Sequence, residues 1–477
     1  MTGIHDPVKL TEKVVSFLND KYHRDDRSAA EFSMMIAHAH LGRLMSKPVL
    51  AMQLIHQYYV GKFDNRVVSD ADTTQLALYS NMVDMLLGHA DGEDTHVQTT
   101  KNQATELPDY FDHFENIQDS KHLVIAISNL AFTTLLKQNK QCAIVYDKDT
   151  ICKIINDHEM KLFLTAGILT QKQFIGLRFK ENKSYMFLHK TLQENLAALH
   201  MLISRDDNNE YMSLIKENFN EPCSVLDCSQ LFTFTCALNP VLAEHMSSCM
   251  MDVITADCHD RVERGVDPDF KLIENAQKLI AIGFVEGRAN GLSMSLTLTH
   301  FTIGGSSPAM SPFAERPKMD MLYCAAKCGV KSLNIRGMHH DMYALSNLQL
   351  FSASSKHTLE FLAVRDIHLK LFDLTKLKYL FVCRNSAYYE MMHLPVNFTE
   401  VQNQIADEFI SKTLPQLSVW RVVLYWIQLG DKQMTLPRSV RSICLYDVAI
   451  SEWSRQHLME WADENKIEFK VLDKIEF

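Results

Sequence analysis

The stretch Tyr185-Met-Phe-Leu-His189-Lys-Thr-Leu-Gln193-Glu194-Asn-Leu-Ala-Ala-Leu199 changes its hydrophobic period halfway along. Tyr185 and Phe187 alternate with other residues, which is typical of a β-strand. Apolar residues then recur at helical spacing, as Leu188, Leu192, Leu196, Leu199 and Ile203. The pattern predicts a short strand that runs directly into a helix, with the polar residue His189 at the junction.

The residues before this stretch predict a small helical module that is closed by a β-hairpin. Helices are expected over 120–137 and 147–155, a turn at Gly167 and a further strand over 174–179. Helix, turn, strand and strand in this order are the outline of a winged-helix module. A helix over 65–88, capped by Thr73 or Thr74, would precede it and carry Leu76 and Tyr79 on one face.

The first 60 residues also favour helices. Pro48 opens the apolar run Pro48-Val-Leu-Ala-Met-Gln-Leu-Ile, and a proline in the first turn of a helix loses no hydrogen bond. The stretch 88–115 differs, because its seven acidic residues face a single Lys101. We interpret 88–115 as an exposed acidic loop, which is usually a solvated linker.

The C-terminal half changes from helices over 210–290 to short strands beyond residue 319. The most linker-like segment, 303–318, lies between them and is rich in Gly, Ser and Pro. The spacing apolar-x-x-apolar-x-apolar starts at Val330, Leu359, Leu377, Leu417 and Val440. Two of the four intervals fit a leucine-rich repeat of about 20–29 residues. The pattern predicts an irregular leucine-rich-repeat-like α/β solenoid, and an α/β domain with buried strands is the alternative.

Composition places the chain in a broad class. It has 477 residues, enough for two to four domains, with 47% hydrophobic residues and a net charge of −10. An acidic balance argues against binding nucleic acid, which needs a basic face. Eleven scattered cysteines and a start without a basic or apolar leader predict reduced thiols and a cytoplasmic location. No run reaches the length of a membrane span, so no membrane contact is expected.

Nucleotide chemistry would need a glycine-rich phosphate loop, which this chain lacks. Gly61-Lys62 has the right pair, but His56 and Phe63 stand where the motif needs glycine and a hydroxyl. The sequence therefore predicts a protein that is not an enzyme and has no cofactor in isolation.

The other candidate sites can each be explained by an ordinary structural role. The pairs Cys223/Cys228, Cys324/Cys328 and Cys258/His259 lack zinc-site form, which favours buried thiols. A Cys–His hydrolase built from Cys258 or Cys383 with His339 or His340 has no local signature. His339-His340-Asp341 is a metal cluster or an exposed loop. Aromatic residues that could form a core or a binding face are Trp420, Tyr425, Trp426, Trp453 and Trp461.

The opening stretch, with its aromatic-x-Phe-Leu-His and Gln-Glu, resembles the end of the winged-helix domain in NOD-like receptors, the NACHT-type ATPases of innate immunity. Leu44 to Leu54 is similar to the family's Leu-x-x-x-Pro-Leu helix, and Leu76-Ala-Leu-Tyr79 to the Leu-Tyr that follows. Ala166-Gly-Ile-Leu169 resembles the Ser-Gly-Leu-Leu before the winged hairpin. Asn195 departs from the family's aromatic residue.

The resemblance implies a role for two residues. His189 falls on the histidine that contacts the phosphate of bound ADP, and Pro48 on the proline that lies against the adenine. An imidazole at the end of a strand has a fixed direction and can donate one hydrogen bond to an anion. The alternative is a histidine whose hydrogen bonds are satisfied inside the winged-helix core.

The resemblance also implies a domain order, entered after the ATPase domain. Residues 1–65 would be the helical domain 1-like end of a NACHT module, 66–205 the winged helix, 206–302 helical domain 2-like, 303–318 the linker and 319–477 the repeat-like domain. The expected function is the regulatory and sensing part of an autoinhibited receptor, with ADP or ATP bound only if a nucleotide-binding domain is present. Expected partners are a second receptor copy, a signalling adaptor and an unknown ligand. The alternative is a stand-alone scaffold or decoy without nucleotide switching.

Overall fold

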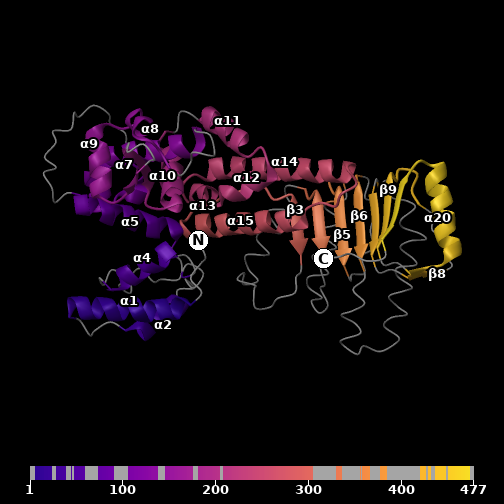
Figure 1. Ribbon diagram of the computed structural model, residues 1–477, viewed down its shortest axis with the longest axis horizontal. Helices are drawn as coiled ribbons and strands as arrows, with labels where there is room; N and C mark the ends of the chain where they lie inside the picture. The colour runs from indigo at the N-terminus through magenta and orange to yellow at the C-terminus, as the bar shows by residue number, and fades with distance from the viewer. Residues whose placement is uncertain are drawn as a thin grey trace. The chain divides into compact units, whose positions relative to one another are not determined.

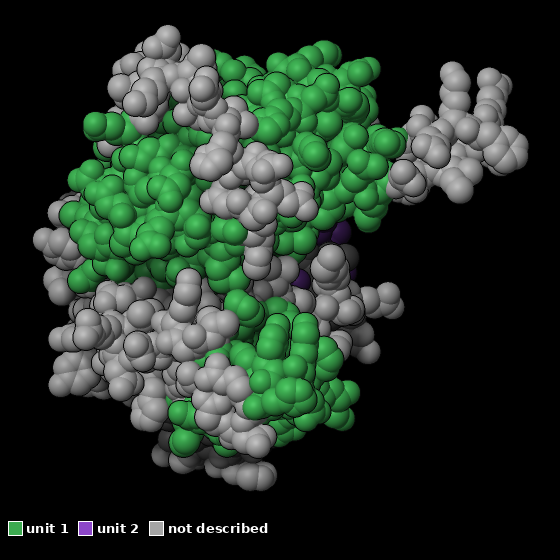
Figure 2. Space-filling model, turned by 90° about the vertical axis from the view of Figure 1, so that its left-hand side faces the viewer, with its two compact units in different colours: residues 1–220, 227–246, 282–295 green, residues 221–226, 247–281, 296–477 purple. Residues whose placement is uncertain are grey.

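The computed structural model describes residues 6–23, 28–38, 45, 48–59, 74–90, 106–137, 145–175, 181–204, 208–303, 329–335, 355, 357–365, 376–383, 419, 421–425, 428–430, 436–446 and 449–472. It is mainly helical with a parallel β-sheet (Figure 1). The chain divides into two compact units (Figure 2). Unit 1 comprises Met1–Asn220, Asp227–Met246 and Ile282–Ser295, and unit 2 comprises Glu221–Leu226, Ser247–Ala281 and Leu296–Phe477.

Unit 1 begins with helices α1 (Pro7–Tyr22), α2 (Ala29–His38) and α4 (Pro48–Tyr59). Asp6 caps α1 by accepting a hydrogen bond from the backbone N–H of Lys9 at 3.0 Å. Pro48 is the first residue of α4, as its position in the sequence predicted.

Helix α5 (Gln75–Ala90) starts after Thr74, whose hydroxyl accepts the backbone N–H of Ala77 at 3.1 Å. The predicted cap is therefore confirmed. The predicted acidic loop 88–115 is wrong at its C-terminal end, because Phe111 and Phe114 are buried and the chain forms η1 (Asp109–Phe111). Aromatic side chains supply the apolar surface that overrides the local charge. Residues 91–105 lie outside the described residues.

The centre of unit 1 contains helices and an antiparallel hairpin in the predicted order, but the first strand begins at Leu169 and not at 174. Residues 176–179 of the predicted strand lie outside the described residues. After α6 (Glu115–Asp119), α7 (Lys121–Phe132) continues into the π-helical turn η2 (Thr133–Lys137), and α8 (Lys148–Cys152) and α9 (Asp157–Thr165) follow. The antiparallel strands β1 (Leu169–Ile175) and β2 (Glu181–Phe187) pair in register from Leu169↔Phe187 to Ile175↔Glu181. Gly167 makes the turn before β1 with φ +76°, a conformation that glycine adopts without strain. Helix α10 (Lys190–Ile203) begins directly after this hairpin.

Five further helices follow: α11 (Asn208–Asn218), α12 (Pro222–Asp227), α13 (Ser229–Leu238), α14 (Pro240–Glu263) and α15 (Phe270–Ala289). Helix α15 packs closely on α13, because a Cβ on Gly283 would lie 2.7 Å from Cε1 of Phe232. The structure bears out the helices predicted over 210–290. No helix in the described part of the chain has both the length and the apolar character to cross a membrane.

Unit 2 contains a seven-stranded sheet in which all paired neighbours are parallel. Its strands are β3 (His300–Ile303), β4 (Ser332–Ile335), β5 (Phe361–Arg365), β6 (Tyr379–Cys383), β7 (Arg421–Tyr425), β9 (Ser442–Tyr446) and β11 (Glu468–Leu472). They lie in chain order, as the row of arrows in Figure 1 shows. Strands β8 (Gln428–Gly430) and β10 (Ala449–Ile450) form a separate pair, and α20 (Glu452–Glu464) precedes β11.

Each of the five predicted patterns overlaps a strand of this sheet. The buried residues in register on successive strands are Leu333, Leu362, Leu380, Val422 and Ile443. Each is the second apolar position of its pattern except Val422, which is the third, because β7 begins at Arg421. The first strand, β3, was not predicted and comes before the linker assigned to 303–318. Residues 304–328 lie outside the described residues.

Alternation along parallel strands places every second residue on the same face of the sheet. The first residues of the strands form one row, because each is in register with its neighbour. This row, which we call the start row, consists of His300, Ser332, Phe361, Tyr379, Arg421, Ser442 and Glu468. It contrasts with the apolar row one residue later, because six of its seven members carry a polar or charged group, Phe361 being the exception.

Candidate functional site

His189 occupies the N-cap of α10, in extended backbone with φ −150° and ψ 143°. Its Nδ1 atom accepts a hydrogen bond from the backbone N–H of Thr191 at 3.1 Å. A backbone N–H can only donate, so Nδ1 presents its lone pair. In the neutral ring the proton is therefore on Nε2, which becomes the donor of the half-buried imidazole.

The first turn of α10 adds to the electrostatics around this ring. Backbone N–H groups at a helix N-terminus carry partial positive charge and stabilise nearby anions. A neutral histidine that donates from Nε2 is compatible with an anion at this point. The arrangement can hold a negative oxygen by one side-chain hydrogen bond.

Tyr79 connects α5 to the beginning of α10. Its hydroxyl is hydrogen bonded to Thr191, and burial raises the pKa of Tyr79 far above its ordinary value. Two segments on which the family resemblance rests, Leu76–Tyr79 and Tyr185–Leu199, therefore pack together in unit 1. Helix α4, which begins at Pro48, also packs on α5. The side chain of Pro48 is outside the described set, so its predicted adenine contact stays a prediction.

A buried polar network supports the next turn of α10. Gln193 donates hydrogen bonds from Nε2 to the Tyr146 hydroxyl at 2.7 Å and to the Thr134 hydroxyl at 3.0 Å. Tyr146 bridges Tyr185 of β2, and Thr134 is the second residue of the π-helical turn. The network fixes the rotation of α10 and hence the direction of the His189 ring.

The cysteine candidates do not form a reactive site among the described residues. Cys258 is buried, and burial raises the pKa of its thiol to about 12, which keeps it protonated. Cys236, Cys249 and Cys444 are also buried and Cys228 is half-buried, in agreement with the thiol interpretation. No group of three or more His, Cys, Asp or Glu that could hold a metal ion occurs in the described ranges.

Several candidates fall where the structure gives no description of the side chain. Cys324, Cys328, His339, His340, Asp341, Trp420 and Trp426 lie outside the described residues, and the side chains of Cys223, Cys383 and Tyr425 are likewise not described. Trp453 on α20 is 57% exposed and stacks on His457 with ring centroids 5.2 Å apart. Trp453 is therefore not a core residue.

Sequence reasoning missed the polar contacts between α14 and the beginnings of the strands in unit 2. Nε2 of His259 lies 2.8 Å from Oε2 of Glu360, and Nζ of Lys378 lies 2.9 Å from the same oxygen. One helical turn earlier, Thr255 Oγ1 lies 2.9 Å from Nε2 of His300. The only sequence signal was positional, because Glu360 and Lys378 each stand immediately before a strand.

Arg421 is the most deeply buried charge of the start row. Its side chain is 3% exposed, and its Nε and Nη2 atoms donate to Oδ1 of Asp267 at 3.3 and 3.2 Å. Nη1 donates to the Ser442 hydroxyl at 2.8 Å, and that hydroxyl donates to Glu468 at 3.1 Å. The turn between α14 and α15 is thereby attached to three strands.

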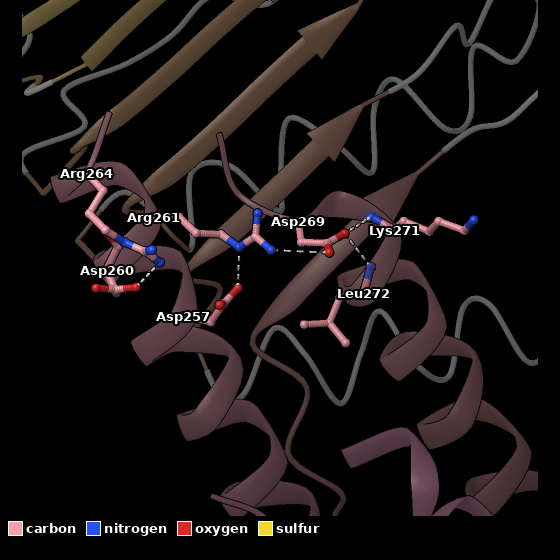
Figure 3. A network of polar contacts seen from close by, with 7 residues as sticks. All are labelled: Asp257, Asp260, Arg261, Arg264, Asp269, Lys271 and Leu272. Carbon is pink, nitrogen blue, oxygen red and sulfur yellow. Dashed lines mark hydrogen bonds and ion pairs between the residues drawn. The ribbon is translucent and has the colours of Figure 1, made fainter. Parts of the chain in front are cut away.

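The same turn carries a second polar network (Figure 3). Arg261 on α14 binds Asp257 at 2.9 Å and reaches Asp269 at 3.6 Å. Asp269 in turn caps α15, because its Oδ1 accepts the backbone N–H groups of Lys271 and Leu272. Arg264 pairs with Asp260. The Arg264–Asp260 pair is exposed, and exposed pairs contribute little free energy each. We assign the network to shaping the turn.

Comparison with known proteins adds no relative: no protein-family model matches the chain, and no curated protein sequence matches it.

Proposed function

We propose that this chain is the regulatory and sensing part of a NOD-like innate immune receptor, a conformational switch and not an enzyme. The observation that carries the proposal is His189, whose Nδ1 accepts the Thr191 N–H and so leaves Nε2 as a donor at a helix N-terminus. This is the chemistry that a phosphate oxygen needs. ADP on a nucleotide-binding domain would be the ligand.

The finer architecture belongs to the same proposal. Two helices, an antiparallel hairpin and α10 are consistent with a winged helix. Parallel strands that follow one another in chain order are consistent with a leucine-rich-repeat-like solenoid. In this scheme the helical module clamps the nucleotide-binding domain, and the sheet region senses a ligand or blocks self-association.

A charge-assisted hydrogen bond of this kind contributes about 1.5–3 kcal/mol. That is enough to bias two conformations roughly 10- to 100-fold. One such hydrogen bond from His189 is therefore strong enough to act as a latch that opens when the phosphate contact is lost.

The test measures the release of labelled ADP from a separately produced NACHT-type ATPase domain after adding the full chain. We expect the chain to slow release about tenfold or more, and the variant His189→Ser to remove that effect. Serine is a good N-cap, so this variant keeps the helix cap while it removes the ring. His189→Asp is the sharper variant, because it also caps α10 but repels an anion.

Equal ADP release with wild type and His189→Ser, at equal helicity by circular dichroism, would show that the latch is wrong. If the wild-type chain has no effect on ADP release, the stand-alone scaffold or decoy becomes the better description. The matched control is His158→Ser, on α9 and outside the N-cap of α10.

A further inference from the structure

The C-terminal half of α14 lies against the strand beginnings through two side chains that are one helical turn apart, Thr255 and His259. Thr255 Oγ1 contacts Nε2 of His300 at 2.9 Å and accepts from Nζ of Lys331 at 3.4 Å. His259 contacts Glu360 and Lys378. All of these residues belong to unit 2, and they join the helix to the beginnings of β3, β4, β5 and β6.

The donors and acceptors define the protonation state of His300. The Thr255 hydroxyl donates its single proton to the Met251 carbonyl at 2.7 Å, so it can only accept from the ring. Nε2 of His300 must therefore carry the proton, which leaves the Nδ1 lone pair. Nδ1 is buried without a hydrogen-bond partner, and His300 is 1% exposed.

The same reasoning applies to His259. Nζ of Lys378 lies 3.2 Å from Nδ1, and an ammonium has no acceptor, so Nδ1 presents its lone pair. The ring proton is then on Nε2, which lies 2.8 Å from Oε2 of Glu360. A second proton on this ring would have to sit on Nδ1, where it would face the Lys378 ammonium.

The charges around both rings oppose protonation overall. Burial lowers the pKa of His259 most, and the cations Lys378 and Lys331 lower it further. The carboxylates of Glu360 and Glu263 raise it, but the pKa is lowered overall. Burial is also the largest cause that lowers the pKa of His300, and Lys331 and His259 lower it further. A hydrogen bond to the Met251 backbone raises this pKa, but it still falls to about 3. Two cations and one carboxylate at the strand beginnings therefore surround two neutral imidazoles.

We propose that His259 and His300 form an acid-sensitive lock that holds the C-terminal half of α14 on the parallel sheet. When both rings are neutral, the polar contacts to Thr255, Glu360 and Lys378 hold the helix on the sheet. Acid releases it, because an opened helix exposes the rings to water, where they take up protons. The lock makes the mobility of α14 depend on pH independently of any nucleotide contact at His189.

The direction follows from linkage. A ring whose pKa is lower in the closed state than in the open state favours closure above about pH 6.5 and favours it less as the pH falls. At pH 5.5 the open form of His300 is mostly protonated, whereas the closed ring, with a pKa of about 3, is not. The opening constant should therefore rise about tenfold from pH 7.5 to 5.5 for His300 alone, and His259 adds in the same direction.

Hydrogen exchange of the full chain tests the lock. The opening constants of the α14 amides over 251–263 are obtained from observed exchange rates divided by intrinsic rates at each pH. The double variant with His259→Gln and His300→Gln keeps a donor and an acceptor at each position but cannot titrate. We expect a rise of more than about tenfold in wild type and a flat profile in the double variant.

The control is His245→Gln, an exposed position on the same helix, which should keep the wild-type rise. The single variant His259→Gln serves if the double variant is unfolded at pH 7.5, and it should show a smaller rise than wild type. An unchanged rise in the glutamine variant would overturn the proposal. An equal rise in the amides of α10 would do the same, since it would mean general unfolding.

Discussion

Replacing Asp267 by alanine is expected to destabilise the sheet of unit 2 by about 3 kcal/mol, because it leaves the buried Arg421 cation without its carboxylate. Asp267 itself is 39% exposed, whereas the Arg421 side chain is 3% exposed. Arg421→Met should therefore be milder, at about 1 kcal/mol or less, since it removes the buried charge and leaves a carboxylate that water can solvate.

Native-state hydrogen exchange of the β7 and β9 amides measures both changes. The informative result is their order, because simple loss of a contact would make the two variants equal. A larger loss for Arg421→Met than for Asp267→Ala would contradict the charge-burial argument. Asp260→Ala is the matched control, since its partner Arg264 is exposed and the pair should contribute less than about 1 kcal/mol.

Gly287→Ala is expected to destabilise the packing of α15 on α13 by about 2 kcal/mol. Alanine favours a helix by about 1 kcal/mol over glycine, but a Cβ here would lie 2.7 Å from the Cys236 carbonyl oxygen. A backbone atom cannot move aside as a side chain can, and overpacking of a filled interior costs about 1–3 kcal/mol or more. Gly283→Ala meets side-chain atoms of Cys236 and Phe232 and should be milder.

The measurement is the midpoint of urea unfolding followed by circular dichroism, together with exchange of the α13 and α15 amides. Lys278→Ala, at an exposed position of α15, is the control and should shift the midpoint little. A Gly287→Ala protein that is as stable as wild type would mean that α13 and α15 are not packed this closely.

Local patterns were enough to predict most of the elements that position the site. The change of period after Phe187 predicted the boundary between β2 and α10, and the Val330 and Leu359 patterns predicted β4 and β5. These predictions succeed because hydrophobic period depends on residues that are close along the chain. The C-terminal end of the acidic loop was mispredicted, because burial of Phe111 and Phe114 depends on what they pack against.

The candidate site was predictable only in part. The position of His189 at a strand–helix junction follows from its sequence, but the nitrogen that carries its proton follows from the hydrogen bond to Thr191. The hydrogen bond from Tyr79 to the same threonine joins segments more than a hundred residues apart in the chain.

By itself the sequence predicted most of the helices and strands, the proline start of α4 and the position of His189 between β2 and α10, but it did not predict β3 or the start of β1. Only the tertiary structure decided which polar side chains meet. Arg421 binds Asp267 from 154 positions away, and His300 meets Thr255 from 45 positions away. Periodicity specifies which face of an element is buried, whereas side-chain pairing depends on the register and packing of elements that the chain brings together only when it folds.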